Sequence, residues 1–256
     1  MFNIEEFDIK LDTDFIGRNF IYCQEINSTN DYLFANKSPS INGTVILAEN
    51  QSHGKGRRNR EWLSLEGMNL TFSLLLKSAI DATRIHLLNF GAALSVAQSI
   101  ENLYQLNVEL KWPNDVLVDG RKLAGILVES SSHGSKIERV VIGFGINVNQ
   151  TNFTGRFLYP PTSIKREFKQ QASRERLLSE VLNNFELILG SIKSEPDKIL
   201  ASWKERCKLL GEKIKIEDDG KIKYGIFDDI DSDGFLLLKT EKGVERITVG
   251  DVSIIG

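Results

Sequence analysis

The amino-acid sequence predicts an α+β fold followed by a small antiparallel β-barrel, and two observations lead to this prediction. Up to about residue 210, short β-prone runs typical of strands are mixed with segments whose apolar residues recur at helical spacing. Beyond residue 211 only short β-prone runs remain, separated by turns rich in Asp and Gly. We therefore expect two domains, over residues 1–210 and 211–256.

Length and composition agree with this fold class. The 256 residues suit one large domain plus a small one, and 41% hydrophobic with 26% charged residues is ordinary for a globular protein. The formal net charge of -3 argues against a general binder of nucleic acid or anionic membranes. Cys23 and Cys207 lie far apart with no metal-binding spacing, and no signal peptide or membrane span is recognisable. We expect a cytoplasmic protein.

Apolar, β-prone runs predict the strands of the first domain, at 20–24, 44–48, 69–76, 108–118, 122–129 and 139–148. Pro113 must break or bulge one of these runs, because proline has no backbone donor and forces the residue before it out of the helical region. Asp119 and Gly120 form a two-residue hairpin turn before the next strand.

Helical periodicity predicts a long core helix at 81–106, where Asp81 is placed to cap the first turn. A short helix is expected at 27–37. Ser28 or Thr29 offers the side-chain oxygen that caps its free backbone amides.

The rest of the chain reads as an irregular segment, two helices and the barrel. Residues 152–168 are expected to be irregular. Amphipathic helices are expected at 173–189 and 196–210, the second with Pro196 in its first turn, where the missing N–H is not needed. The barrel strands are expected at 213–216, 221–227, 235–239, 244–249 and 252–255.

A basic, glycine-containing loop joins two of the predicted strands and reads GKGRRNR at 54–60. Glycines let the backbone fold closely around an anion, and four cations concentrate positive charge there: Lys55, Arg57, Arg58 and Arg60. The spacing is not that of a P-loop. Taken alone, the loop is also compatible with a solvated basic loop, and a nucleic-acid patch is disfavoured because no aromatic residues interleave with the cations.

Three more motifs read KWPND at 111–115, KLAGILVE at 122–129 and GFGINVN at 143–149. The first puts a cation, an amide and a carboxylate where a strand breaks, a place suited to catalysis or metal binding. Lys122 begins the second and is placed to reach a phosphate, and the glycines of the last two permit close approach of a ligand. A polar turn around a buried Trp112 and a solvated Lys122 are the alternatives.

In their order and spacing, these motifs resemble the biotin protein ligase family. The resemblance spans roughly residues 20–150 and rests on matches to the family's motifs at Ser28-Thr29-Asn30, Gln51, 54–60, 111–115, 122–127 and 143–147. Two departures occur in the basic loop. Lys55 replaces an Arg and keeps its charge, and Asn59 replaces a Gly, whose left-handed backbone conformation Asn tolerates.

The resemblance implies a core like that of class II aminoacyl-tRNA synthetases, with a mixed, largely antiparallel sheet packed with helices, and a C-terminal SH3-like β-barrel. Long members of the family carry a winged helix-turn-helix ahead of this core. Too few residues precede Ser28 to form one, so we expect a monofunctional ligase that does not bind DNA.

The resemblance also implies a reaction in which biotin and ATP form biotinyl-5′-AMP, with Mg²⁺, and biotin then passes to a lysine of a biotin carboxyl carrier protein. Cations preplaced where negative charge develops would supply much of the catalysis. We therefore expect Lys122, Arg57 and Asp115 to be catalytic, with Asp115 also a candidate ligand for Mg²⁺ or base for the acceptor lysine.

Two sets of binding residues follow from the same resemblance. Biotin is expected to contact Ser28, Thr29, Asn30, Gln51, Lys55, Gly56, Arg57, Lys122, Gly125 and Leu127. The nucleotide is expected to contact Lys55, Arg57, Arg58, Arg60, Trp62, Lys111, Asn114 and Asn147. The basic loop should close over the ligands, because a mixed anhydride must be kept from water.

Two other functions remain open at this point. A lipoate or octanoate ligase shares the fold, although the basic loop favours biotin. A non-catalytic nucleic-acid-binding module would use the cations at 57–60 and would show steep salt dependence without ATP turnover. The family resemblance also allows a homodimer formed by pairing sheet edges, and no membrane partner is expected.

Overall fold

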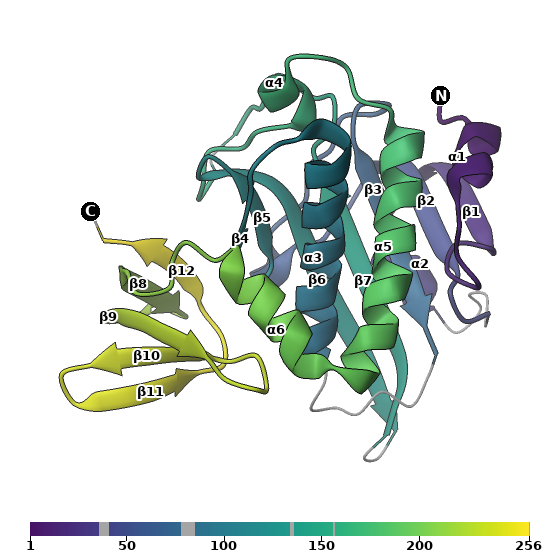
Figure 1. The fold of residues 1–256 in the computed structure, drawn as a ribbon. Helices are drawn as coiled ribbons and strands as arrows, with labels where there is room; N and C mark the ends of the chain where they lie inside the picture. Colours follow the sequence, from purple (N-terminus) through teal and green to yellow (C-terminus); the bar gives the residue numbers. More distant parts are fainter. Residues whose placement is uncertain (36–40, 78–84, 134–135, 156, 256) are drawn as a thin grey trace.

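A seven-stranded mixed sheet forms the centre of the computed structural model, which describes residues 1–35, 41–77, 85–133, 136–155 and 157–255. The strand order is β1-β2-β3-β7-β6-β5-β4 (Figure 1). The bounds are β1 Phe20–Ile26, β2 Val45–Gln51, β3 Leu70–Leu76, β4 Val108–Lys111, β5 Asp115–Val118, β6 Arg121–His133 and β7 Lys136–Ile146. Only β1 and β2 pair in parallel, which confirms the mixed, largely antiparallel sheet.

Residues 108–118 form two strands, which corrects the prediction of one interrupted run. The chain reverses at Pro113, and β4 and β5 pair antiparallel with Lys111 directly opposite Asp115. A proline cannot continue the hydrogen-bond ladder, and the apolar pattern on either side is the same for a bulge as for a reversal. The predicted Asp-Gly turn between β5 and β6 is confirmed, with φ of 50° at Asp119 and 70° at Gly120.

Three helices cover one face of the sheet. In Figure 1, α3 (Ile85–Tyr104) and α5 (Arg174–Ser194) lie side by side in front of the strands, with α6 (Pro196–Glu205) beside α3. The long helix predicted at 81–106 is confirmed from residue 85 onward, and its predicted cap, Asp81, lies outside the described residues.

The opposite face of the sheet carries α2 (Thr29–Phe34), which packs on β2, β3 and β7. Ser28 caps this helix by accepting a hydrogen bond from the backbone N–H of Asp31, as predicted.

Side chains of the central strands alternate between the two faces. Phe72 of β3 and Phe144 of β7 stack in the core with ring centroids 4.6 Å apart, and Phe144 meets Phe185 of α5 edge-on. Their odd-numbered neighbours therefore point to the α2 face.

Short helices were harder to predict than long ones. α1 (Ile4–Lys10), capped by Asn3, had no prediction, and α4 (Ile164–Phe168), capped by Ser163, lies within the segment expected to be irregular. A single side-chain cap and one or two turns leave too little periodic signal.

The C-terminal residues form a separate five-stranded antiparallel sheet in the order β11-β10-β9-β8-β12. Its strands confirm those predicted: β8 Lys213–Asp218, β9 Lys221–Ile230, β10 Leu236–Thr240, β11 Gly243–Ile247 and β12 Asp251–Ile254. The indole Nε1 of Trp112 donates to the carbonyl of Gly234 at 3.1 Å and joins this sheet to the core.

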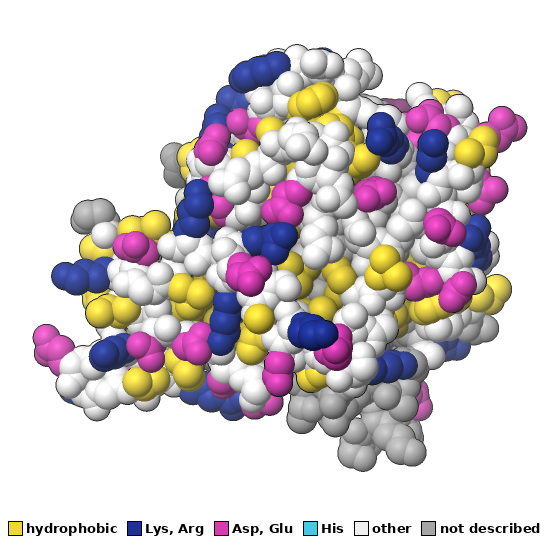
Figure 2. Space-filling view, in the orientation of Figure 1, with side chains coloured by type: hydrophobic (Ala, Val, Ile, Leu, Met, Phe, Trp, Pro, Cys, Tyr) yellow, Lys and Arg dark blue, Asp and Glu magenta, His cyan; other side chains and the backbone are white. Residues whose placement is uncertain are grey.

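Acidic and basic side chains are interspersed over the face that carries α3, α5 and α6 (Figure 2). No helix in the part of the chain that the structure describes is long and apolar enough to cross a membrane.

Candidate active site

A row of paired residues crosses the α2 face of the large sheet and forms the floor of the site. In register, Thr71 of β3 lies beside Gly145 of β7, then Gly125 of β6, Asp115 of β5 and Lys111 of β4. Paired residues of a sheet point to the same side. With about 4.8 Å between strands, the row is about 19 Å long. Its centre is bare backbone, its Thr71 end is neutral and its Lys111 end is charged.

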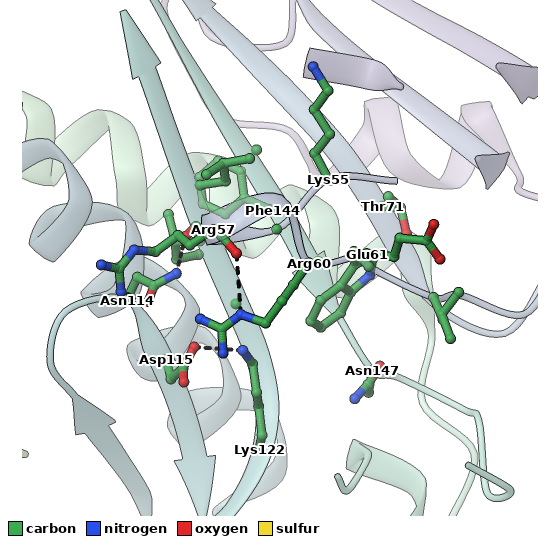
Figure 3. A pocket seen from close by; sticks show the side chains of 18 of the residues that line it. Lys55, Arg57, Arg60, Glu61, Thr71, Asn114, Asp115, Lys122, Phe144 and Asn147 are labelled. Carbon is green, nitrogen blue, oxygen red and sulfur yellow. Dashed lines mark hydrogen bonds and ion pairs between the residues drawn. The ribbon is translucent and has the colours of Figure 1, made fainter. Parts of the chain in front are cut away.

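A cavity of about 400 Å³ lies over this row (Figure 3). The structure brings most of the predicted site residues together in its lining: Ser28, Thr29, Asn30, Gln51, Lys55, Gly56, Arg57, Arg60, Trp62, Asn114, Asp115, Lys122, Gly125, Leu127 and Asn147. Two predicted site residues, Arg58 and Lys111, do not line the cavity.

Hydrogen bonds link uncharged side chains at one end of the cavity, where Asn30 Nδ2 also donates to the Glu129 carboxylate at 2.6 Å. Gln51 Oε1 accepts from the backbone N–H of Thr29 at 2.7 Å and from its hydroxyl at 3.0 Å. Ser73 Oγ lies 2.7 Å from Thr29 Oγ1 and 2.5 Å from Asn30 Oδ1. A side chain at Gly143 would collide with the Asn30 amide. The glycine is therefore needed for Asn30 to lie flat on β7.

Three charged groups gather at the opposite end. Lys122 Nζ donates to Asp115 Oδ1 at 2.7 Å, and Lys111 Nζ lies 3.9 Å from Asp115 Oδ2. Burial alone would raise the pKa of Asp115, but the two lysines hold it below its usual value. Burial also lowers the pKa of Lys111 to about 8, against a weaker opposing effect of Asp115. Asp115 is thus an ionised carboxylate that fixes Lys122 in the cavity.

The backbone of Lys122 is held on both sides by the segment before α4. Its N–H donates to the carbonyl of Pro160 at 2.9 Å, and its carbonyl accepts from the N–H of Thr162 at 2.8 Å. Asn147 ties the same segment down, since its side-chain amide donates to the carbonyl of Thr162 at 2.9 Å.

The basic loop is closed on itself above the cavity. The backbone N–H of Trp62 donates to the carbonyl of Gly54 at 2.9 Å, and that of Gly56 to Arg60 at 2.7 Å. A side chain at Gly54 would collide with the Trp62 carbonyl. Arg58 in this loop has a left-handed backbone conformation, with φ of 56°.

The loop's cations point in different directions. Arg57 Nη1 donates to Asn114 Oδ1 at 3.3 Å, and burial lowers the pKa of this guanidinium. Lys55 instead forms an ion pair of 2.5 Å with Asp31 and is directed away from Asp115 and Lys122 (Figure 3). Of Arg57 and Lys55, Arg57 is therefore the better placed to act at the charged end.

Sequence reasoning did not identify Thr71, Ser73 or the aromatic segment 153–159 as part of the site. Thr71 and Ser73 look like ordinary strand residues, and only the register places them beside the glycines. Phe153, Phe157 and Tyr159 line the cavity from the segment expected to be irregular.

Two polar atoms of the cavity wall are buried without a hydrogen-bond partner among the described residues, Trp62 Nε1 and Thr71 Oγ1. The Trp62 ring lies directly on Gly145, where any side chain would collide with it. Since buried polar groups are normally paired, a ligand on the glycine floor is the natural partner for these atoms.

The fold and the cavity place the chain among the biotin and lipoate protein ligases. The model of the biotin/lipoate A/B protein ligase family matches residues 21–147, and that of the biotin protein ligase C-terminal domain matches residues 209–254.

Individual relatives give the same result. The bifunctional ligase/repressor BirA of Bacillus spizizenii is 31% identical over 252 residues, which are 95% of this chain and 76% of that protein. The biotin--[acetyl-CoA-carboxylase] ligase of Paracoccus denitrificans is 32% identical over 224 residues, 84% of this chain and 92% of that protein. The structure of the biotin protein ligase from Aquifex aeolicus in complex with biotin and ATP matches with a TM-score of 0.80 at 28% identity, over 93% of this chain and 99% of the other. The chain belongs to the biotin protein ligase family and is a ligase.

Proposed function

We propose that this chain activates biotin with ATP and transfers it to a lysine of a carboxylase's biotin carrier protein. A carboxylate oxygen of biotin attacks the α-phosphorus of ATP and displaces pyrophosphate. The lysine amine then attacks the carbonyl carbon of biotinyl-5′-AMP and displaces AMP. The observation that carries the proposal is the row from Thr71 to Lys111, which offers neutral donors and acceptors at one end and cations at the other.

The two ends suit the two parts of the substrate. The ureido ring of biotin is neutral and needs paired donors and acceptors, which Thr29, Asn30 and Gln51 supply. Its tail crosses the row at Gly145 and Gly125, where the Trp62 ring lies against the glycine backbone and offers an apolar contact surface.

At the charged end the carboxylate meets the α-phosphate, and both are negative. Lys122 and Arg57, which both line the cavity, stabilise the charge that develops there, because cations placed in advance need little reorganisation during the reaction. Asp115 positions Lys122 through their 2.7 Å ion pair.

Magnesium fits this site best as part of the nucleotide substrate. The described residues contain no cluster of three acidic, histidine or cysteine side chains that would hold a metal. Asp115 has one oxygen on Lys122 and the other 3.9 Å from Lys111, so it does not form a metal site by itself. We therefore assign Mg²⁺ to the phosphates of ATP.

The decisive experiment is to incubate the protein with ATP, Mg²⁺ and one carboxylic acid at a time. With biotin we expect release of pyrophosphate and accumulation of biotinyl-5′-AMP, and then labelling of an added biotin carrier domain. Octanoate and lipoate serve as matched substrates in parallel reactions. Adenylate formed from octanoate or lipoate but not from biotin would overturn the proposed substrate.

Gly143→Ala is expected to raise the KM for biotin by about ten-fold or more. The new methyl group displaces the Asn30 amide, and misplacing one binding group by about 1 Å is enough for such a loss. Gly190→Ala in α5 is the matched control, because a Cβ there has no atom within 4 Å. Equal KM values for the two variants would remove Asn30 from the biotin site.

A further inference from the structure

The C-terminal sheet holds the basic loop through two carboxylates. Arg58 Nη2 forms an ion pair with Asp218, and its Nη1 lies 3.7 Å from Asp251 Oδ2 and donates to the carbonyl of Glu217 at 3.1 Å. Arg60 Nη2 lies 2.8 Å from Asp251 Oδ1. Two cations of the loop are therefore bound by residues about 160 to 190 positions further along the chain.

These ion pairs are partly sheltered from water. The side chains of Arg58 and Asp251 are 23% and 24% exposed, those of Asp218 and Arg60 are 39% and 45% exposed, and Asp251 is shared by both arginines. Sharing one carboxylate favours the two pairs, because ordering one partner lowers the entropic cost of the next.

The contacts lie where the loop most needs support. Arg58 has a left-handed backbone conformation, which is uncommon for any residue other than glycine and persists when neighbouring contacts hold it. Arg57, which reaches Asn114 in the cavity, is the residue directly before Arg58. The direction of the Arg57 side chain therefore depends on how Arg58 is held.

The same C-terminal strand also reaches the other wall of the cavity. Tyr159, which lines the cavity, donates from its hydroxyl to the carbonyl of Val252, the residue after Asp251 in β12. One strand thus contacts both the basic loop and Tyr159, which line the same cavity.

We propose that Asp218 and Asp251 are positioning residues that hold the basic loop over the cavity and thereby set how long the acyl-adenylate is retained before transfer. The inference rests on the proposed function. The two aspartates touch no reacting atom, since they act through Arg58 and Arg60 on the placement of Arg57. Asp218 gives the cleaner test, because Asp251 also interacts electrostatically with Arg57 and Lys111.

The test measures the release of labelled biotinyl-5′-AMP from preloaded enzyme into an excess of unlabelled adenylate. We expect release to be about two- to five-fold faster in Asp218→Asn and about five- to ten-fold faster in Asp251→Asn, as for loss of one or two sheltered ion pairs. Adenylate formation should slow by a smaller factor than release accelerates. Asp219→Asn is the matched control, since it removes the same charge at an exposed, left-handed position that asparagine tolerates and that forms no ion pair with the described residues.

Two further measurements separate positioning from general destabilisation. Raising the ionic strength should accelerate release more in the parent than in Asp218→Asn, which has already lost the salt-sensitive contact. The exchanged pair Arg58→Asp with Asp218→Arg should retain adenylate better than either single change, which a loss of stability alone would not produce.

The outcomes distinguish this inference from the proposed function. If the parent makes no adenylate from biotin and ATP, the proposed function fails. If the parent makes and retains it, and Asp218→Asn and Asp251→Asn release it no faster than Asp219→Asn, the positioning role is wrong. Equal acceleration in all three variants would likewise show a general charge effect and overturn it.

Discussion

Lys122→Ala is expected to slow formation of biotinyl-5′-AMP by about 100-fold, measured as a single-turnover rate with saturating biotin and ATP. Removing one preorganised charge from an active site costs about two to three orders of magnitude. Lys122 lies 2.7 Å from Asp115, and its backbone is pinned on both sides, so no neighbouring lysine takes its place easily. In the variant, Lys111, at 3.9 Å, is the remaining lysine close to Asp115 among the described residues.

The matched control for this change is Lys242→Ala, which removes a lysine from the exposed turn between β10 and β11. Its rate should equal that of the parent. A Lys122→Ala enzyme that forms the adenylate as fast as Lys242→Ala would take Lys122 out of the mechanism.

Arg174→Met is expected to lower the free energy of unfolding by about 3–5 kcal/mol, because it leaves a buried carboxylate without its partner. Arg174 Nη1 lies 2.6 Å from Glu49 Oε2 and its Nη2 3.0 Å from Glu49 Oε1, and both side chains are less than a tenth exposed. Tyr22 and the backbone N–H of Gly67 complete the carboxylate's hydrogen bonds. Urea unfolding at neutral pH measures the loss.

The pH dependence of this difference has a definite sign. Burial would raise the pKa of Glu49, but hydrogen bonds from Arg174 and Tyr22 lower it below the unfolded value. A lowered carboxyl pKa contributes stability above the unfolded pKa of about 4.3, and this contribution is lost as the pH falls through the folded pKa. The difference in the free energy of unfolding between parent and variant should therefore be largest above about pH 5 and should become smaller in acid.

Arg176→Met, two residues further along α5, is the matched control because Arg176 is exposed. It should change the free energy of unfolding by less than about 0.5 kcal/mol. Adding Glu49→Gln to Arg174→Met should recover part of the loss, since the unpaired charge is then gone. A loss from Arg174→Met no larger than that from Arg176→Met would contradict the buried-pair argument.

Local periodicity was enough to predict most of the fold. Strands of the large sheet and of the C-terminal sheet appear close to their predicted positions, because short apolar, β-prone runs bounded by turn residues are typical of strands. The run at 108–118 was predicted less well, since the pattern does not show whether Pro113 bulges the strand or reverses it. Helices α1 and α4 were too short to show a period at all.

Site residues could be predicted where they lie in contiguous sequence motifs. They could not be predicted where their place in the site depends on strand register or on contacts with distant parts of the chain. Lys122 and Asp115 were both expected in the site, in separate roles, and the structure places them in contact. Thr71 enters the site only because β3 pairs with β7 in one particular register. Arg58 carries the same charge as Arg57 and lies in the same loop. Its guanidinium is nevertheless held outside the cavity by Glu217 and Asp218, more than 150 positions further along the chain.

The glycine floor of the cavity limits how substrate choice can change by mutation. At Gly125, Gly143 and Gly145 the smallest residue is already present, so a substitution at any of them can only make the slot shallower. Room for a bulkier acid must come instead from the cavity walls, where Trp62 and Thr71 can be replaced by smaller residues. Selection for ligases that accept enlarged biotin analogues should therefore accumulate changes at these two positions and leave the three glycines untouched.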